Sequence, residues 1–229
     1  MKSTRKLQPS DIVILVLGLT GAGKSTFINK AMGEDVLDVG HTLDSCTQDI
    51  SCVPCLCPND SSRHIIFVDT PGFDHSSGDD ERILQHIAEW LARAYRAKTK
   101  IAGIVYLHEI SLTRHGAYSK TALDIISRLC GEAGLKNVIL ATTKWNDLQV
   151  EAAAQKREKQ LQVDWTRMLD HGSRMARFYG TTQSALDIVE LILQKPPIDS
   201  LQIQQEMGRY RKGFSETEAA KTLRKYRLA

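Results

Sequence analysis

The sequence predicts an α/β protein in which a mostly parallel sheet carries helices on both faces. Segments that are apolar throughout, as expected of strands covered on both faces, are separated by segments whose apolar residues recur at helical spacing. Strands and helices also alternate along the chain, and this order favours a three-layer arrangement. With 229 residues, of which 42% are hydrophobic, the chain can bury a sizeable core.

The first half of the chain is predicted from its apolar runs. Residues 11–17 form a buried strand, and a helix follows at 24–32. An edge strand is predicted at 48–53 and a second buried strand at 64–69.

The second half continues the alternation. Ser76 or Ser77 is expected to cap the next helix, because three acidic residues would then lie in its first turn and complement the helix dipole. The remaining predicted elements are a strand at 101–108, a helix around 123–129, a strand at 137–143, a helix at 151–170, a short strand at 174–179 and a helix at 184–193.

The segment after Pro196 and Pro197 is predicted to form one or two amphipathic helices. We therefore divide the chain into a domain at 1–195 and a C-terminal helical extension at 196–229. From Lys195 onward, eight Lys or Arg residues oppose four Asp or Glu residues, so the extension is basic and the rest of the chain nearly neutral. We expect the extension to pack back on the domain or to pair with a second subunit, since its apolar face is thin for a membrane contact.

Composition narrows the class of protein further. No apolar run reaches the roughly 18 residues of a membrane span, and the basic N-terminal stretch lacks a signal-peptide core. We expect a cytoplasmic protein with reduced cysteines and, because its body is neutral, without a nucleic-acid partner. Cys52, Cys55 and Cys57 could hold zinc only with a fourth ligand such as Cys46 or a nearby histidine. The alternative is a proline-containing turn between two strands.

One stretch has the pattern of a phosphate-binding loop. Gly18-Leu19-Thr20-Gly21-Ala22-Gly23-Lys24-Ser25 fits G-x-x-x-x-G-K-[ST] and lies between a predicted strand and helix. Its glycines allow backbone N–H groups to surround phosphates at the positive end of the helix. The Lys of this pattern reaches the β- and γ-phosphates, and the Ser hydroxyl coordinates Mg²⁺. The residues expected to bind the nucleotide here are Gly21, Ala22, Gly23, Lys24, Ser25 and Thr26.

Two further stretches suit the metal and the γ-phosphate. Asp69 ends a buried strand, where its carboxylate would hold Mg²⁺ through a water, and the backbone N–H of Gly72 would meet the γ-phosphate. Among Thr42, Ser45 and Thr47, we expect Thr47 to close on the metal, because it borders a strand.

A fourth stretch suits recognition of a base. Residues 143–147, Thr-Lys-Trp-Asn-Asp, stand where GTPases place [NT]-K-x-D, whose Asp binds guanine and whose Lys packs on the base. Asn146 occupies the Asp position and Asp147 follows it, so either the amide or the carboxylate could read the base. Base contacts are expected from this motif and from a later loop: Thr143, Lys144, Asn146, Asp147, Gly180 and Thr181.

Together these stretches resemble the TRAFAC-class GTPases. Within them the sequence is most similar to the septin-like branch of AIG-type, GIMAP-like and Toc-like proteins, above all the single-domain AIG-like G proteins of fungi. The stretches GLTGAGKSTFIN, SCTQDI, DTPGFD, YLHEIS and TTKWND carry the resemblance, which runs from Asp11 to about Leu193. It implies a P-loop NTPase fold of the small-GTPase type, GTP or GDP with Mg²⁺, and homodimers formed across the nucleotide face.

The residue after Gly72 bears on the rate of hydrolysis. Phe73 stands where Ras-like proteins have the Gln that orients the attacking water. We therefore expect slow hydrolysis that a dimer accelerates, with a polar group from His75, Arg63 or Arg114. The candidate catalytic residues are Lys24, Thr47, Gly72 and His75. A GTP-binding scaffold with almost no hydrolysis is the alternative, and a nucleotide kinase is disfavoured because no arginine-bearing lid is evident.

Overall fold

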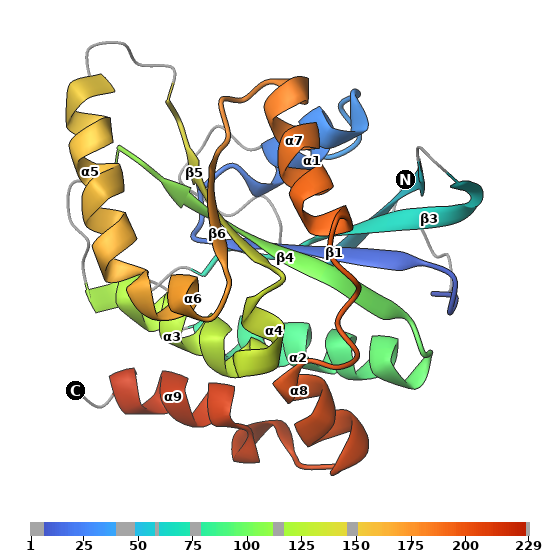
Figure 1. The fold of residues 1–229 in the computed structure, drawn as a ribbon. Coiled ribbons are helices and arrows are strands. Elements are labelled where there is room, and N and C mark those ends of the chain that lie inside the picture. The colour runs from blue at the N-terminus through green and yellow to red at the C-terminus, as the bar shows by residue number, and fades with distance from the viewer. Residues whose placement is uncertain are drawn as a thin grey trace.

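The fold is a six-stranded sheet between layers of helices, in a computed structural model that describes residues 7–39, 49–57, 60–73, 79–111, 117–145 and 151–227. The strand order is β2-β3-β1-β4-β5-β6. Neighbouring strands from β3 to β6 are parallel, and β2 runs antiparallel to β3. Figure 1 shows helices on both faces of this sheet. The predicted fold class is confirmed.

The strands are β1 (Ile12–Gly18), β2 (Ser51–Cys57), β3 (Asp60–Asp69), β4 (Lys100–Glu109), β5 (Val138–Thr143) and β6 (Arg174–Arg177). Every residue of β1 and β5 is buried, which explains the apolar run of β1 and the apolar first half of β5. The register pairs Val16 with Asp69 and Glu109 with Thr143, so the carboxyl ends of β1, β3, β4 and β5 meet at one edge. Ligands of open α/β sheets bind at this edge.

The helices of the domain are α1 (Lys24–Met32), α2 (Asp80–Arg96), α3 (Ala117–Cys130), α4 (Glu132–Leu135), α5 (Glu151–Asp164), α6 (Thr166–Asp170) and α7 (Thr182–Leu193). Helices α1 and α7 cover one face of the sheet, where Phe27 and Ile188 lie in one apolar cluster. Helices α2 and α3 cover the other face, where Leu91 and Ile126 lie in a second cluster. The sheet therefore has a core on each side.

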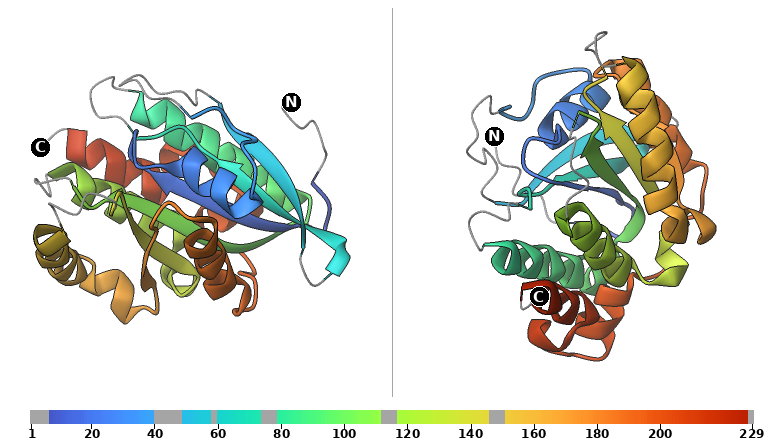
Figure 2. Two further views of the ribbon diagram at one scale, coloured as in Figure 1. Left: turned by 90° about the horizontal axis from the view of Figure 1, so that it is seen from above. Right: turned by 90° about the vertical axis from the view of Figure 1, so that its left-hand side faces the viewer.

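The C-terminal segment packs on the outer side of α2 and α3 (Figure 2). It comprises α8 (Gln202–Gln204), a π-helical turn (Gln205–Arg209), a 3₁₀ turn (Phe214–Glu216) and α9 (Glu218–Arg227). Leu201, Ile203 and Leu223 are buried in the α2–α3 cluster, and the Gln204 side chain donates to the Leu91 carbonyl at 3.0 Å. The expected packing against the domain is thus observed.

Strand β2 begins at Ser51 instead of residue 48, and it ends at Cys57 instead of residue 53 because Pro54 and Cys55 continue the strand instead of forming a turn. Proline is tolerated there because β2 is an edge strand. Alternation along β2 packs Cys52 against the α2–α3 cluster and packs Cys55 and Cys57 against the α1–α7 cluster. The sheet thus separates Cys52 from Cys55 and Cys57, so the three thiols cannot bind one zinc ion together. In the described segments no three His, Cys, Asp or Glu residues are grouped to hold a metal.

Two predicted helix boundaries are wrong. The N-cap of α2 is Asp79, two or three residues later than expected, and its carboxylate pairs with Arg82 at 3.4 Å instead of capping. Ser76 and Ser77 lie outside the described residues. The helix predicted at 151–170 breaks at Trp165, since the chain turns there to bury the indole in the core. Across the described ranges, no helix has the length and apolarity that a membrane span requires.

Candidate functional site

The loop between β1 and α1 has a backbone that only glycine adopts readily. Gly21 has φ 78° and Gly23, at the N-cap of α1, has φ 92°. A side chain at either position would be strained in this left-handed region. The loop thus brings the first N–H groups of α1, which have no partner within the helix, to the carboxyl edge of the sheet. An anion can bind at this end of the helix.

Lys24 folds back over this loop. Its Nζ donates to the carbonyl oxygens of Gly18 at 3.3 Å and Leu19 at 3.0 Å, and the residue is only 7% exposed. Burial lowers the pKa of Lys24 to about 8, although the charge of Asp69 opposes this shift. The ammonium group is therefore held at the loop and gains from any negative charge placed there.

Ser25 and Asp69 meet directly. The Ser25 hydroxyl donates to Asp69 Oδ2 at 2.9 Å, across 44 positions of sequence. Asp69 is 1% exposed at the end of β3, and the next residue, Thr70, donates its hydroxyl to the Val16 carbonyl at 2.8 Å. A hydroxyl and a carboxylate at the phosphate-binding end of a helix are oxygen ligands of the kind Mg²⁺ takes. The structure thus brings together two of the three predicted metal ligands.

Gly72 lies against the phosphate loop. A Cβ on Gly72 would stand 2.5 Å from the Thr20 backbone nitrogen and 2.6 Å from Thr20 Cα. The Thr20 N–H donates to the Phe73 carbonyl at 3.2 Å, and the Phe73 N–H donates to the Gly18 carbonyl at 3.4 Å. The side chain of Phe73 is 3% exposed and packs in the core. The segment after β3 and the phosphate loop therefore form one connected unit, in which glycine is required sterically.

The base motif is fixed to the same unit. The Thr143 hydroxyl donates to the Ala22 carbonyl at 3.0 Å, which links the carboxyl end of β5 to the phosphate loop. Lys144 has φ 61°, and its Nζ donates to Glu109 Oε2 at 2.6 Å. The sequence reasoning missed Glu109. Its position at the end of a predicted strand beside the base motif was the available signal.

Trp145 helps to hold the base motif in place. Its Nε1 donates to the carbonyl and hydroxyl oxygens of Thr142 at 3.2 and 3.0 Å. The Arg177 guanidinium carbon lies 4.3 Å from the indole ring centre, and Glu158 accepts from Arg177 Nε at 2.8 Å. The Glu158 hydrogen bond raises the pKa of Arg177. Arg177 and Glu158 were also missed, because nothing in their spacing relates them to residues 143–147.

Gly180 and Thr181 form the start of α7. Gly180 has φ 74°, and Thr181 is the N-cap, whose side chain accepts from the Ser184 N–H at 3.2 Å. The Thr181 hydroxyl is thus used by the helix cap. A contact between this turn and a base would therefore be made by the backbone of Gly180 and Thr181.

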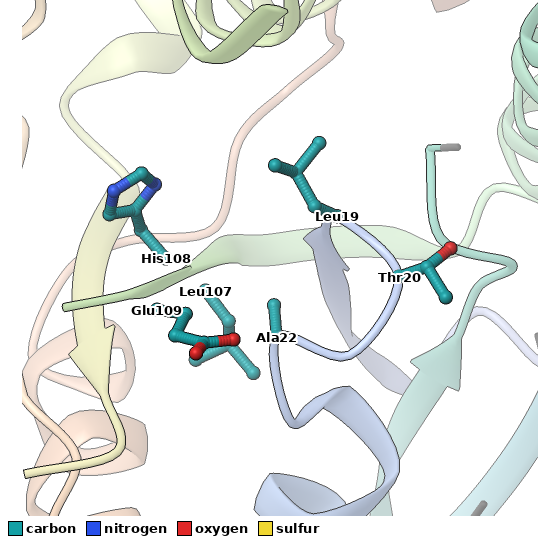
Figure 3. Close-up of a pocket in the computed structure, with 6 residues that line it drawn as sticks. All are labelled: Leu19, Thr20, Ala22, Leu107, His108 and Glu109. Atoms are coloured by element: carbon teal, nitrogen blue, oxygen red, sulfur yellow. The ribbon is translucent and has the colours of Figure 1, made fainter. Parts of the chain in front are cut away.

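A small pocket lies between the phosphate loop and the end of β4 (Figure 3). Its volume is about 110 Å³, well below the roughly 300 Å³ of the smaller ligand sites. It is a recess behind the loop rather than the whole nucleotide site. The six residues that line it are Leu19, Thr20, Ala22, Leu107, His108 and Glu109.

Several predicted residues lie outside the described part of the chain: Thr47, His75, Arg114, Asn146 and Asp147. Arg63 is described, and its Nε donates to the Ser10 carbonyl at 3.5 Å. Ser10 precedes β1, so Arg63 stands at the amino end of the strands, opposite the phosphate loop. This position, at the end of the sheet away from the phosphate loop, disfavours Arg63 as the source of the polar group.

A glycine loop lies between a buried strand and a helix, with Lys24 and Ser25 at the helix start and Asp69 on the adjacent strand, and this arrangement defines a P-loop nucleotide-binding protein. The family model described as 50S ribosome-binding GTPase matches residues 13–160, and the chain belongs to this family.

Curated relatives support the same class. The GTPase Era of Thermotoga maritima is 27% identical over 126 residues, which is 55% of this chain and 37% of Era. Era of Thermotoga petrophila gives the same values. The chain therefore matches little more than a third of the length of these relatives.

Solved structures share the fold. Toc33 from Arabidopsis thaliana in complex with GDP and Mg²⁺ has a TM-score of 0.63 and 16% identity, covering 85% of this chain and 88% of Toc33. Toc33 with Mg²⁺ and GMPPNP has a TM-score of 0.60 and 17% identity, covering 82% and 87%. Era bound to MgGDPNP and a segment of 16S ribosomal RNA has a TM-score of 0.60 and 17% identity, covering 82% and 59%.

Proposed function

We propose that this protein binds GTP and GDP with Mg²⁺ and hydrolyses GTP slowly, and that a homodimer across the nucleotide face accelerates hydrolysis. One observation carries the nucleotide part. Lys24 is buried on the phosphate loop while Ser25 and Asp69 pair beside it. This arrangement places a cation for phosphate beside oxygen ligands for a metal, at a helix start whose N–H groups are free of helical partners.

Each part of the site has a proposed role. Residues 21–26 hold the phosphates, and Ser25, Asp69 and Thr47 hold Mg²⁺, which neutralises phosphate charge when it is bound. Gly72 offers its N–H to the γ-phosphate. Thr143, Lys144 and the Gly180–Thr181 turn surround the base, which is read by Asn146 or Asp147. The pairing of Thr143 with Ala22 supports this assignment, because it holds the base motif beside the phosphate loop.

Slow hydrolysis follows from the residue after Gly72. The phenyl ring of Phe73 is buried in the core and offers no group to orient a water. His75 and Thr47 are the proposed local contributors. Dimerisation is important for the GTPase activity of Toc33 and Toc159, which are components of the chloroplast translocon. The likeness in fold to Toc33 supports a similar dimer here.

The rest of the chain supports a role that does not depend on lipid or nucleic acid. Much of the positive charge of the C-terminal segment is paired within the protein: Lys212 with Glu206, Lys221 with Glu218, and Arg224 and Arg227 with Glu81. We propose a cytoplasmic protein with a nucleotide domain at 1–195 and an extension at 196–229 that is available to an effector protein.

The test is a calorimetric titration of the nucleotide-free protein with GDP and with ADP in the presence of Mg²⁺. GDP is expected to bind, and ADP at least about 100-fold more weakly, a difference of about 2.7 kcal/mol. Lys24→Ala should abolish GDP binding, while the matched surface control Lys159→Ala, on an exposed position of α5, should not change it. Equal affinity of the wild type and Lys24→Ala, or tighter binding of ADP, would refute the proposal.

A further inference from the structure

We infer that Glu109 is a positioning residue for the base motif: its carboxylate holds Lys144 ready to pack on the nucleotide base and so sets the affinity for guanine nucleotides. The inference rests on the proposed function and names a residue that the motif itself does not contain.

Glu109 reaches Lys144 from the neighbouring strand. It is the last residue of β4 and stands in register with Thr143, the last residue of β5. Its Oε2 accepts from Lys144 Nζ at 2.6 Å, and its Oε1 accepts from the Ser111 hydroxyl. The Glu109 side chain is 19% exposed and that of Lys144 is 50% exposed. This is a short charge-assisted hydrogen bond, which Lys144 donates to a half-buried carboxylate that is itself held in place.

The backbone of Lys144 is already fixed by its neighbours. Thr143 is bonded to Ala22 in the phosphate loop, and Trp145 is bonded to Thr142. These contacts hold Lys144 at φ 61°, a conformation that non-glycine residues rarely adopt. The long side chain of Lys144 is then the part whose conformation is still free to change. An ion pair with Glu109 restricts its rotamers before the nucleotide arrives, so less conformational entropy is lost on binding.

A second role for Glu109 predicts the opposite effect. Glu109 lines the small pocket together with Thr20 and Ala22 of the phosphate loop (Figure 3). If its charge acted only by repelling the phosphates, neutralising it would tighten the binding of every phosphate ligand. If it positions Lys144, neutralising it weakens the ligands that carry a base and leaves a bare polyphosphate unaffected. The sign of the change therefore separates the two roles.

The experiment compares GDP with inorganic tripolyphosphate, both with Mg²⁺, by competition against a fluorescent GDP analogue. Glu109→Gln keeps the shape of the side chain. It is expected to lower the affinity for GDP about 5- to 20-fold, because the lost bond is charge-assisted and partly exposed. The affinity for tripolyphosphate should not change. Lys144→Met should also weaken GDP, and Glu109→Gln should add nothing in that background. The control is Glu132→Gln, at an exposed position on α4.

The inference is overturned if Glu109→Gln binds GDP as Glu132→Gln does, binds it more tightly, or loses tripolyphosphate to the same extent. If Glu109→Gln does not fold, as judged by thermal unfolding, Glu109→Asp takes its place with the same expected direction, since its carboxylate is one methylene short of Lys144. A wild type that binds no guanine nucleotide would overturn the proposed function as well. A wild type that binds GDP beside an unaffected variant overturns this inference alone.

Discussion

Lys24 is a residue whose position in the binding site lowers the stability of the folded protein. Its ammonium group is buried against the phosphate loop, where two carbonyl oxygens are its hydrogen-bond acceptors. Burial lowers its pKa to about 8 from 10.5, so the charged form is less stable in the folded protein than in the unfolded chain. Residues placed for a ligand commonly reduce stability in this way.

The pH dependence of unfolding tests this cost. The unfolded chain binds more protons than the folded protein between about pH 8 and 10.5, so wild-type stability should rise with pH across that window. Lys24→Met lacks this titration. The free energy of unfolding of the nucleotide-free wild type should therefore gain on the order of 2 kcal/mol relative to Lys24→Met from pH 7 to pH 10.5. Urea unfolding at both pH values measures the gain, and parallel pH profiles would contradict the burial of the charge.

Gly72 is a residue that packing alone requires. A methyl group there would stand 2.5 Å from the Thr20 nitrogen, so the phosphate loop and the segment after β3 must move apart. Gly72→Ala is expected to destabilise the protein by about 1–3 kcal/mol and to weaken a GTP analogue more than GDP. Thermal unfolding and titration measure these effects.

Gly213→Ala is the matched control for Gly72→Ala, since the nearest atom to its Cβ is 3.4 Å away and its φ is −64°. This substitution should change neither the unfolding temperature nor the affinity for nucleotide. If Gly72→Ala behaved in the same way, the close approach to Thr20 would not matter for binding.

At the scale of elements, the attachment of α9 depends on a buried carboxylate. Glu206, in the π-helical turn, accepts from Lys212 Nζ at 3.2 Å and from the Glu218 N–H at 3.3 Å, at the start of α9. Salt bridges of α9 to Glu81 are exposed and contribute little by themselves. The buried apolar residues and this cap therefore hold the element.

Glu206→Gln tests the cap. The substitution removes the charge that serves both Lys212 and the first N–H of α9, and it should reduce the free energy of unfolding by about 1–2 kcal/mol. Glu190→Gln, at an exposed position on α7, is the control and should have no measurable effect. Relative to the wild type, Glu206→Gln should accelerate hydrogen exchange in α9 more than in the sheet. An equal acceleration of exchange in both elements would contradict a local role of Glu206.

At the scale of the whole molecule, the proposed dimer makes a kinetic prediction. The buried Phe73 offers no group for orienting water, so we expect the rate per protomer to depend on the fraction that is paired. Single-turnover GTP hydrolysis is expected to accelerate as protein concentration rises, and analytical ultracentrifugation should show dimers in the same range. A measurable rate that stays constant would exclude stimulation by the dimer, and a rate near zero at every concentration would favour the scaffold alternative.

The local pattern of apolar residues was sufficient to predict most of the strands and helices. Unbroken apolar runs predicted β1, β4 and β5, because strands covered on both faces need no polar alternation. The boundaries that failed were decided by tertiary contacts. β2 extends through Pro54 because an edge strand does not need that N–H, and α5 ends before Trp165 because the indole is buried.

The sequence by itself determined the phosphate loop and the presence of Lys24 and Ser25 at the start of α1, because these features depend on neighbouring residues and on glycine backbone freedom. Only the tertiary structure decided which distant side chains meet. Ser25 contacts Asp69 across 44 positions, and Lys144 contacts Glu109 across 35 positions. A parallel sheet brings the ends of strands together from segments far apart in the chain, and the register that sets their neighbours arises from packing on both faces.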